Sequence, residues 1–344
     1  MRHSVSQTQT KCLDPLYNPQ VFRHQNMDSL TRRTFLEKLA AISAGSFLAA
    51  TAPSAFASGQ SGPHIPFPTA PRDRIAVASY PFRAYIDIPD NRDRDPKLPG
   101  MDLTQFPSEV VTKFGVHNIE PLAQHFRSTD SAYLAKFRLA LQKENVRVVN
   151  IPTYVEASFY DADAAARQKA VAVAKKWVDV AVELGSPSIR PHINGASGSA
   201  PNVQRAAESL REVADYGARK NVVVTLENDD PATEEAFFIV KVIDAVGNPY
   251  LRALPDFANS ILTDDAAYNY RAVQAMFERA YCISHVKDGE VDDHGKQFNI
   301  DLKRTFDIAK STNYRGYFSI EFDAPGEPYA PTSKLIEQTM HYLS

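Results

Sequence analysis

Cysteine is scarce in this chain, which contains only Cys12 and Cys282 among 344 residues. Two cysteines can build neither a disulfide framework nor a cysteine-ligated zinc site. An excess of positive charge is also lacking, since the net charge is −3. Binding to nucleic acid needs clustered positive charge, so this balance argues against a nucleic-acid partner. The 44% hydrophobic content is that of a globular protein with one barrel-sized domain.

Long hydrophobic runs are lacking too. The apolar stretch at residues 39–52 is shorter than the about 20 residues that span a bilayer. It follows Ser-Leu-Thr-Arg-Arg-Thr-Phe-Leu at residues 29–36, which resembles a twin-arginine export signal, and precedes a small-x-small cleavage pattern at residues 55–57. We therefore expect residues 1–57 to be a signal peptide, with Met27 as an alternative start. The alternative is an amphipathic helix that happens to contain Arg-Arg.

This signal predicts a protein exported to the periplasm by the twin-arginine export machinery, which carries folded proteins. Residues 58–73 are rich in Ser, Gly and Pro, a composition typical of a linker. From residue 74 to residue 344, short apolar segments alternate with amphipathic ones. The apolar segments predict strands at 75–79, 115–120, 146–152, 188–192, 221–228, 251–257, 281–287 and 316–322. The amphipathic segments predict helices at 103–114, 130–144, 162–184, 203–220, 233–246, 266–280, 302–311 and 331–343.

Alternation of this kind implies a parallel sheet. Eight strand–helix units within about 250 residues fit an α/β fold of the closed (β/α)8 TIM-barrel type. An open doubly wound sheet is the alternative, and it usually carries a glycine-rich turn after its first strand. The first strand here runs into Ser-Tyr-Pro-Phe-Arg at residues 79–83, which contains no glycine. The sequence therefore favours the barrel.

Four of the predicted strands end in an ionisable residue: Glu227, Asp256, His285 and Glu321. The first three are 29 residues apart and the fourth follows after 36, which is close to the length of one strand–helix unit, about 30 residues. All four should therefore meet at the carboxyl ends of the strands, where the working residues of such barrels lie. Each residue alone would more often be a helix cap, an ion-pair partner or a core histidine, so the evidence is their recurrence in phase.

Three carboxylates brought together repel one another, and a divalent cation is the simplest way to keep them ionised. Three oxygen ligands and one nitrogen ligand suit Mn²⁺ or Mg²⁺ first, with Co²⁺, Fe²⁺ or Zn²⁺ as further options. Glu227, Asp256, His285 and Glu321 are therefore predicted metal ligands.

The motifs around these four residues resemble those of the xylose-isomerase-like TIM-barrel superfamily. They are Val-Thr-Leu-Glu-Asn at 224–228, Leu-Pro-Asp-Phe-Ala-Asn at 254–259, Ser-His-Val-Lys-Asp at 284–288 and Ser-Ile-Glu-Phe at 319–322. The superfamily includes sugar and sugar-phosphate isomerases and epimerases, hydroxypyruvate isomerase, inosose dehydratase and endonuclease IV. The resemblance covers about residues 74–344 and does not fix the substrate.

The resemblance to the epimerase branch implies that the four residues hold one divalent ion and that Glu227 and Glu321 are the catalytic acid/base pair. One glutamate would remove a proton next to a carbonyl and the other would return it, through an enediolate. In two places the chain departs from this branch. Asn259 stands where a histidine is common, and residues 290–294, which include His294, stand where an arginine is common.

Five further residues are predicted to contact substrate at the mouth of the barrel: Glu120, Arg190, His192, Asn259 and Lys287. For most of them an alternative is open. Arg190 and His192 share one strand face and could instead form a salt bridge. Glu120 could support another site residue or form a structural pair, and Lys287 could neutralise Asp256. Tyr80 and Phe82 could line the site or pack in the core.

The sequence thus predicts a metal-dependent sugar isomerase or epimerase that acts on a small carbohydrate. The alternatives are a lyase or hydratase on oxidised (3-keto) glycosides and a non-catalytic sugar-binding barrel. An endonuclease IV-like activity would need a histidine-rich multi-zinc site and a basic surface, and the sequence shows neither. A homodimer is expected only from the resemblance.

Overall fold

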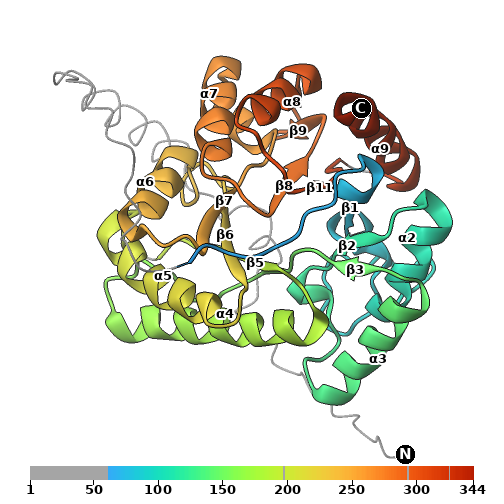
Figure 1. The fold of residues 1–344 in the computed structure, drawn as a ribbon, viewed down its shortest axis with the longest axis horizontal. Coiled ribbons are helices and arrows are strands. Elements are labelled where there is room, and N and C mark those ends of the chain that lie inside the picture. The colour runs from blue at the N-terminus through green and yellow to red at the C-terminus, as the bar shows by residue number, and fades with distance from the viewer. Residues whose placement is uncertain (1–60, 197, 293, 325) are drawn as a thin grey trace, which may run out of the picture. The chain divides into compact units, whose positions relative to one another are not determined.

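The computed structural model describes residues 61–196, 198–292, 294–324 and 326–344. The signal peptide predicted for residues 1–57 lies outside them. Within the described residues, parallel strands follow one another around a closed barrel (Figure 1). The strands are β1 (Ile75–Ala78), β2 (Asn118–Glu120), β3 (Arg147–Val148), β4 (Pro152–Thr153), β5 (Ser188–Pro191), β6 (Val223–Glu227), β7 (Leu251–Leu254), β8 (Ile283–Val286) and β11 (Tyr317–Ile320).

The barrel closes because the first and last strands pair. Ile75 of β1 lies opposite Phe318 of β11, and β11 pairs in turn with β8. Between β7 and β8 the pairing is reduced to two bridges, Ala253 with Ala280 and Asp256 with His285. The predicted (β/α)8 barrel is therefore confirmed.

The third predicted strand is split into β3, which pairs with β2, and β4, which pairs with β5. Pro152 has no N–H to donate, which weakens the ladder at this point. Between the two pieces lies Asn150, whose buried side chain bonds to neighbouring strands. The split therefore directs an amide into the barrel interior.

Helices surround the barrel (Figure 1). They are α2 (Phe106–Phe114), α3 (Ser131–Lys143), α4 (Ala164–Leu184), α5 (Val203–Ala218), α6 (Ala236–Val246), α7 (Ala266–Phe277), α8 (Leu302–Ser311) and α9 (Tyr329–Leu343). Apart from α2 and α9, each of these helices begins with a side-chain cap, such as Asp163 before α4. Helix α4 ends at Gly185, where a φ of 73° favours glycine. Among the described residues, none of the helices combines the length and apolarity needed to cross a membrane.

The segment before β1 lies across the amino-terminal ends of the strands, as the blue trace in Figure 1 shows. The Tyr281 hydroxyl donates to the carbonyl oxygen of Pro63 at 2.8 Å, and the His64 amide donates to Asn221 at 3.1 Å. Phe67 packs edge-on against Tyr281 and Tyr317. The described part of the segment predicted as a linker is thus packed against the barrel.

After β8 the chain forms an antiparallel hairpin of β9 (Gly289–Val291) and β10 (Gln297–Asn299). The sequence does not predict this hairpin, because its strands are three residues long and lack apolar alternation. Gly289 is required there, since a Cβ would lie 2.2 Å from the carbonyl oxygen of Phe298. The hairpin buries Glu290 beside the barrel mouth.

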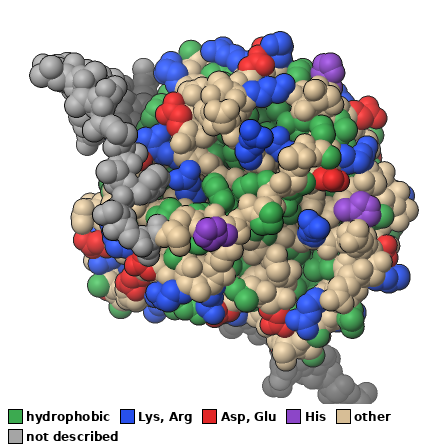
Figure 2. Space-filling view, in the orientation of Figure 1, with side chains coloured by type: hydrophobic (Ala, Val, Ile, Leu, Met, Phe, Trp, Pro, Cys, Tyr) green, Lys and Arg blue, Asp and Glu red, His purple; other side chains and the backbone are tan. Residues whose placement is uncertain are grey.

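The surface in Figure 2 carries both signs of charge. Lys and Arg side chains lie at separated positions on this face, with Asp, Glu and hydrophobic side chains between them. This distribution agrees with the net charge of −3. That the protein has no nucleic-acid partner stays a prediction.

Candidate metal centre

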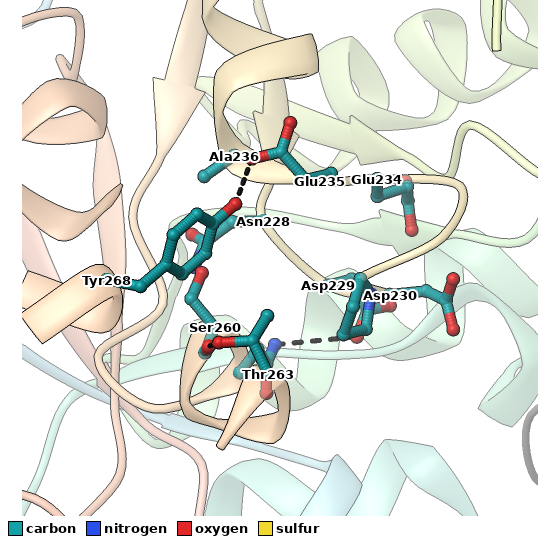
Figure 3. Close-up of a pocket in the computed structure, with 11 residues that line it drawn as sticks. Asn228, Asp229, Asp230, Glu234, Glu235, Ala236, Ser260, Thr263 and Tyr268 are labelled. Carbon is teal, nitrogen blue, oxygen red and sulfur yellow. Dashed lines mark hydrogen bonds between the residues drawn. The ribbon is translucent and has the colours of Figure 1, made fainter. Parts of the chain in front are cut away.

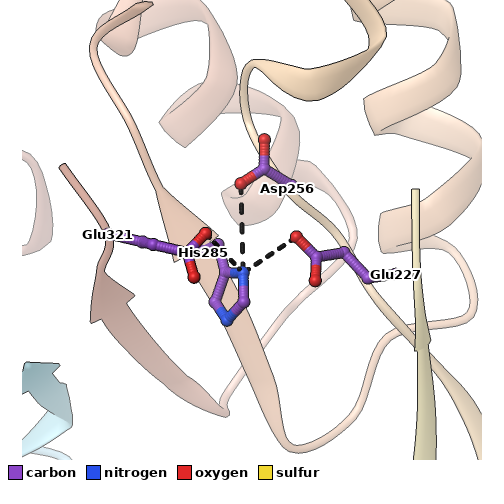
Figure 4. A group of neighbouring side chains, drawn as sticks. All are labelled: Glu227, Asp256, His285 and Glu321. Atoms are coloured by element: carbon purple, nitrogen blue, oxygen red, sulfur yellow. Dashed lines mark hydrogen bonds and ion pairs between the residues drawn. The ribbon is translucent and has the colours of Figure 1, made fainter. Parts of the chain in front are cut away.

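The structure brings together the four residues that the sequence predicts as metal ligands (Figure 4). Glu227 is the last residue of β6, Asp256 follows β7, His285 lies in β8 and Glu321 directly follows β11. One potential ligand atom from each of the four lies within 4.8 Å of the others, and all four side chains are buried. In-phase placement at the strand ends therefore produces one compact cluster.

The two ring nitrogens of His285 face different groups. Nδ1 lies 2.9 Å from Oε1 of Glu227, 3.1 Å from Oε2 of Glu321 and 4.0 Å from Oδ2 of Asp256. Nε2 lies 3.0 Å from both carboxylate oxygens of Glu120. Burial lowers the pKa of His285, but Glu120, Glu227 and Glu321 outweigh it and hold the pKa well above its usual value. Nδ1 is therefore the atom that faces the three carboxylates and could bind a metal ion.

Glu120 lies behind the histidine, and its side chain is fully buried. Its Oε1 accepts from Asn150 at 2.7 Å, and the Ser188 hydroxyl donates to Asn150 at 2.7 Å. A carboxylate in this position fixes the tautomer of a metal-binding histidine. The geometry agrees with the alternative that Glu120 supports another site residue, since its carboxylate faces the His285 ring, and contact of Glu120 with substrate stays a prediction. Sequence reasoning missed Asn150 and Ser188, which lie inside apolar strand segments.

Asp256 shows that the cluster fits a cation. Its Oδ1 accepts the backbone N–H groups of Ala258 and Asn259, each at 2.7 Å. Its Oδ2 is buried without a hydrogen-bond partner and points at His285 (Figure 4). Burial raises the pKa of Asp256 to about 7, Lys287 opposes this rise, and Glu227 and Glu321 add to it. A buried, unpartnered carboxylate oxygen is costly, and a divalent ion would satisfy it.

Lys287 supplies positive charge on the other side of the cluster. Its ammonium nitrogen lies 3.4 Å from Glu321, 3.2 Å from Glu290 and 3.8 Å from Asp256. Burial lowers the pKa of Lys287, but these three carboxylates outweigh it and raise the pKa well above its usual value. Burial would raise the pKa of Glu321, but His285 and Lys287 lower it to about 2. The geometry therefore favours the alternative that Lys287 neutralises carboxylates.

Asn259 connects Lys287 to Glu227. Its Oδ1 accepts from Lys287 at 2.8 Å, and its Nδ2 donates to Glu227 at 3.2 Å and to Asp229 at 3.4 Å. Both ends of the amide are thus engaged within the protein. Contact of Asn259 or Lys287 with substrate stays a prediction.

Arg190 and His192 form salt bridges with the end of β6 and with the loop that follows it. The Arg190 Nη2 atom lies 2.9 Å from Glu227, 2.8 Å from Asp229 and 3.6 Å from Glu234. His192 Nδ1 lies 3.1 Å from both Asp229 and Glu234. The salt-bridge alternative is therefore present in the structure. Sequence reasoning missed Asp229 and Glu234, although Asp229 stands only two residues after Glu227.

His192, Asp229 and Glu234 are close enough together to be considered as a second metal site. Arg190 already brings a permanent positive charge to both carboxylates. Burial and Arg190 lower the pKa of His192, but Glu234 and Asp229 outweigh them and raise it to about 9. Nη1 of Arg190 also contacts Nε2 of His192, so both ring nitrogens are engaged within the protein, and this group is better described as an ion-pair cluster.

A small pocket adjoins the cluster between the loop after β6 and the short helix Asn259–Thr263 (Figure 3). Asp229, Glu234 and Asn259 line it, and Tyr268 directs its hydroxyl to Glu235 at one side. The sequence does not predict this pocket, because it forms where a loop, a short helix and Tyr268 of α7 meet.

The aromatic residues after β1 differ in role. Phe82 is fully buried and packs on Phe106 and Tyr329, so it belongs to the core. The Tyr80 hydroxyl donates to Asp323 at 3.1 Å, and Arg83 stacks on the Tyr80 ring at 4.1 Å. Only Tyr80 therefore remains a candidate to line the mouth.

A known protein family matches most of the chain. The profile of the family described as xylose isomerase-like TIM barrel matches residues 109–344. No curated protein matches the chain.

Solved structures match at low sequence identity. One is a xylose isomerase-like TIM barrel protein from Mycobacterium smegmatis in complex with magnesium (TM-score 0.59, 16% identity, 78% of this chain and 96% of that chain covered). Another is D-psicose 3-epimerase from Clostridium cellulolyticum with D-tagatose (TM-score 0.58, 13% identity, 78% of this chain and 96% of that chain covered). A third is 3-keto-D-glucoside 4-epimerase from E. coli (TM-score 0.56, 13% identity, 77% of this chain and 98% of that chain covered). At these identities the likeness shows the fold alone.

Proposed function

Because the chain belongs to the xylose isomerase-like TIM barrel family, we propose that it is a divalent-metal-dependent enzyme that moves a proton next to a carbonyl of a carbohydrate. The reaction would be an isomerisation or an epimerisation. The observation that carries this proposal is the buried cluster of Glu227, Asp256, His285 and Glu321, in which Oδ2 of Asp256 has no hydrogen-bond partner.

These four residues would hold the ion, with Mn²⁺ or Mg²⁺ first and Co²⁺, Fe²⁺ or Zn²⁺ as further options. Once bound, the ion would polarise the substrate carbonyl and stabilise negative charge on its oxygen. Glu120 keeps His285 oriented, and Lys287 limits the repulsion among the carboxylates. A glutamate of the cluster would take the proton from the carbon beside the carbonyl, leaving an enediolate.

The names of the structural neighbours support a carbohydrate substrate. Two of them are sugar epimerases, one with D-tagatose and one acting on a 3-keto-D-glucoside. The second name also favours the lyase or hydratase alternative on 3-keto-glycosides, because the same proton removal could expel a leaving group. A non-catalytic sugar-binding barrel would not need the buried glutamates of the cluster. We keep twin-arginine export to the periplasm and a homodimer as proposals.

Incubation of the Mn²⁺-loaded protein in D₂O with D-tagatose or a 3-keto-D-glucoside tests the reaction. Deuterium in the recovered sugar, measured by mass spectrometry and NMR, supports isomerisation or epimerisation. A released aglycone supports the lyase. Absence of both, together with absence of bound metal, would contradict the proposed function and leave the binding module.

A further inference from the structure

The two glutamates of the cluster are held differently. Glu227 has both oxygens engaged, with Oε2 2.9 Å from Arg190 and Oε1 3.2 Å from Asn259 and 2.9 Å from His285. Glu321 uses only Oε2, which lies 3.1 Å from His285 and 3.4 Å from Lys287. Its Oε1 receives no hydrogen bond from any residue that the structure describes. The Glu321 side chain is also 10% exposed, against 3% for Glu227.

We propose that Arg190 is a positioning residue that holds Glu227 in its ligand role and withdraws it from proton transfer, so that Glu321 alone is the base. This inference rests on the proposed function and assigns different roles to the two glutamates of that site.

Arg190 is suited to this role by burial and anchoring. Its side chain is 3% exposed, and the Nη2 atom that contacts Glu227 also lies 2.8 Å from Asp229. A guanidinium is planar and permanently charged, so it donates hydrogen bonds and does not take up a proton. Its ion pair with Oε2 of Glu227 stabilises the negative charge of this carboxylate, which a general base has to give up when it takes a proton. Glu227 would have to break this contact before it could take a proton from carbon.

Glu321, unlike Glu227, has a carboxylate oxygen that is free to take a proton. Its Oε1 can approach a substrate carbon while Oε2, which faces His285 and Lys287, would serve as the ligand oxygen. In the step, the C–H bond beside the carbonyl breaks, the proton passes to Oε1 of Glu321, and the electron pair enters the enediolate. The same glutamate can then give the proton to the neighbouring carbon, while a hydroxyl proton moves to the former carbonyl oxygen.

A single base works on one face of the substrate. It permits isomerisation, or elimination in which the leaving group departs with the bonding pair and is protonated by Glu321 or water. It does not deliver a proton to the opposite face, as an epimerisation that inverts the same carbon requires. The clamp on Glu227 therefore favours isomerase or lyase chemistry within the proposed function.

The test compares Glu227→Gln, Glu321→Gln, Arg190→Met and the double variant Glu321→Gln/Arg190→Met. Arg279→Met is the control, because Arg279 pairs with Asp244 at 2.7 Å through each of two nitrogens, outside the cluster. Deuterium uptake from D₂O into D-tagatose and a 3-keto-D-glucoside is measured at saturating Mn²⁺, and the Mn²⁺ dissociation constant is measured by calorimetry.

We expect Glu321→Gln to lower deuterium uptake by about 100-fold or more, and Glu227→Gln by about tenfold or less. The double variant should regain at least about tenfold over Glu321→Gln, because Glu227 is released. Arg190→Met should bind Mn²⁺ at least about threefold more tightly, since a positive charge beside a ligand oxygen is removed. Arg279→Met should change neither quantity.

Equal losses in the two glutamate variants, no regain in the double variant, or an unchanged Mn²⁺ affinity in Arg190→Met would overturn the inference. If Arg190→Met does not fold, Arg190→Lys takes its place with a smaller expected regain, because an ammonium cannot match the guanidinium fork. Failure of the proposed function itself looks different: the wild-type protein would bind no Mn²⁺ and exchange no deuterium.

Discussion

Glu120 and His285 form a buried pair in which both carboxylate oxygens lie 3.0 Å from Nε2 of the imidazole. They come from strands at widely separated positions in the chain, β2 and β8. The pair leaves Nδ1 to face Glu227 and Glu321. Glu120 thus determines which nitrogen is available to a metal ion.

The first prediction concerns this pair. In Glu120→Gln the side chain keeps its size but loses the charge that makes His285 a good ligand, so Mn²⁺ should bind about 10- to 100-fold more weakly. Calorimetric titration with Mn²⁺ measures the change. Glu212→Gln is the control, because Glu212 contacts Gln168 and Lys175 on the outer helices. An unchanged dissociation constant in Glu120→Gln would show that the pair has no influence on the metal.

A second prediction concerns the stability of the metal-free protein. Oδ2 of Asp256 is buried without a hydrogen-bond partner among carboxylates, so the cation should stabilise the fold. At 100 times its dissociation constant, Mn²⁺ should add about 2.7 kcal/mol to the free energy of unfolding. Thermal unfolding with Mn²⁺ and with EDTA measures this difference. Asp256→Asn should abolish the response to Mn²⁺, and a full response in that variant would contradict the role given to Asp256.

A third prediction follows from His125, which is buried with its Nδ1 2.8 Å from the Ser79 hydroxyl. Burial, and to a lesser degree Arg83, lowers the pKa of His125 to about 3. The unfolded chain, with a histidine pKa of about 6.5, therefore binds more protons between these values, and stability falls as pH falls through this range. The full contribution is present above about pH 6.5.

Urea unfolding at pH 7 and pH 5 checks this expectation. Relative to His125→Gln, the wild-type protein should lose about 2 kcal/mol between the two pH values. His117→Gln, at an exposed position, is the control. Parallel losses in the wild-type protein and His125→Gln would mean that His125 is not held neutral.

The fold was predictable because each strand and helix carries its own periodicity, and the four clustered residues were predictable because they share one phase of the strand–helix unit. Asp229 and Glu234 were not, since their places depend on the path of a loop around Arg190. The role of Glu120 was left open, because the sequence does not show that the His285 ring lies in front of it. Periodicity thus determines which residues reach the mouth, whereas side-chain packing determines which of them face substrate.

The last prediction concerns the segment before β1, at the end of the barrel opposite to the cluster. Phe67 is half-buried, with its ring centroid 5.3 Å from that of Tyr281 and 5.8 Å from that of Tyr317. Phe67→Ala should lower the free energy of unfolding by about 1–2 kcal/mol, because part of an aromatic side chain is uncovered. The Mn²⁺ dissociation constant should stay unchanged, since the cluster lies at the carboxyl ends of the strands. Leu139→Ala is the control, because Leu139 is 67% exposed and its loss should cost less than about 0.5 kcal/mol. Equal stabilities of the Phe67→Ala and Leu139→Ala variants in urea unfolding would show that the segment only connects, as a linker does. A lower stability of Phe67→Ala alone would make the segment part of the folded domain.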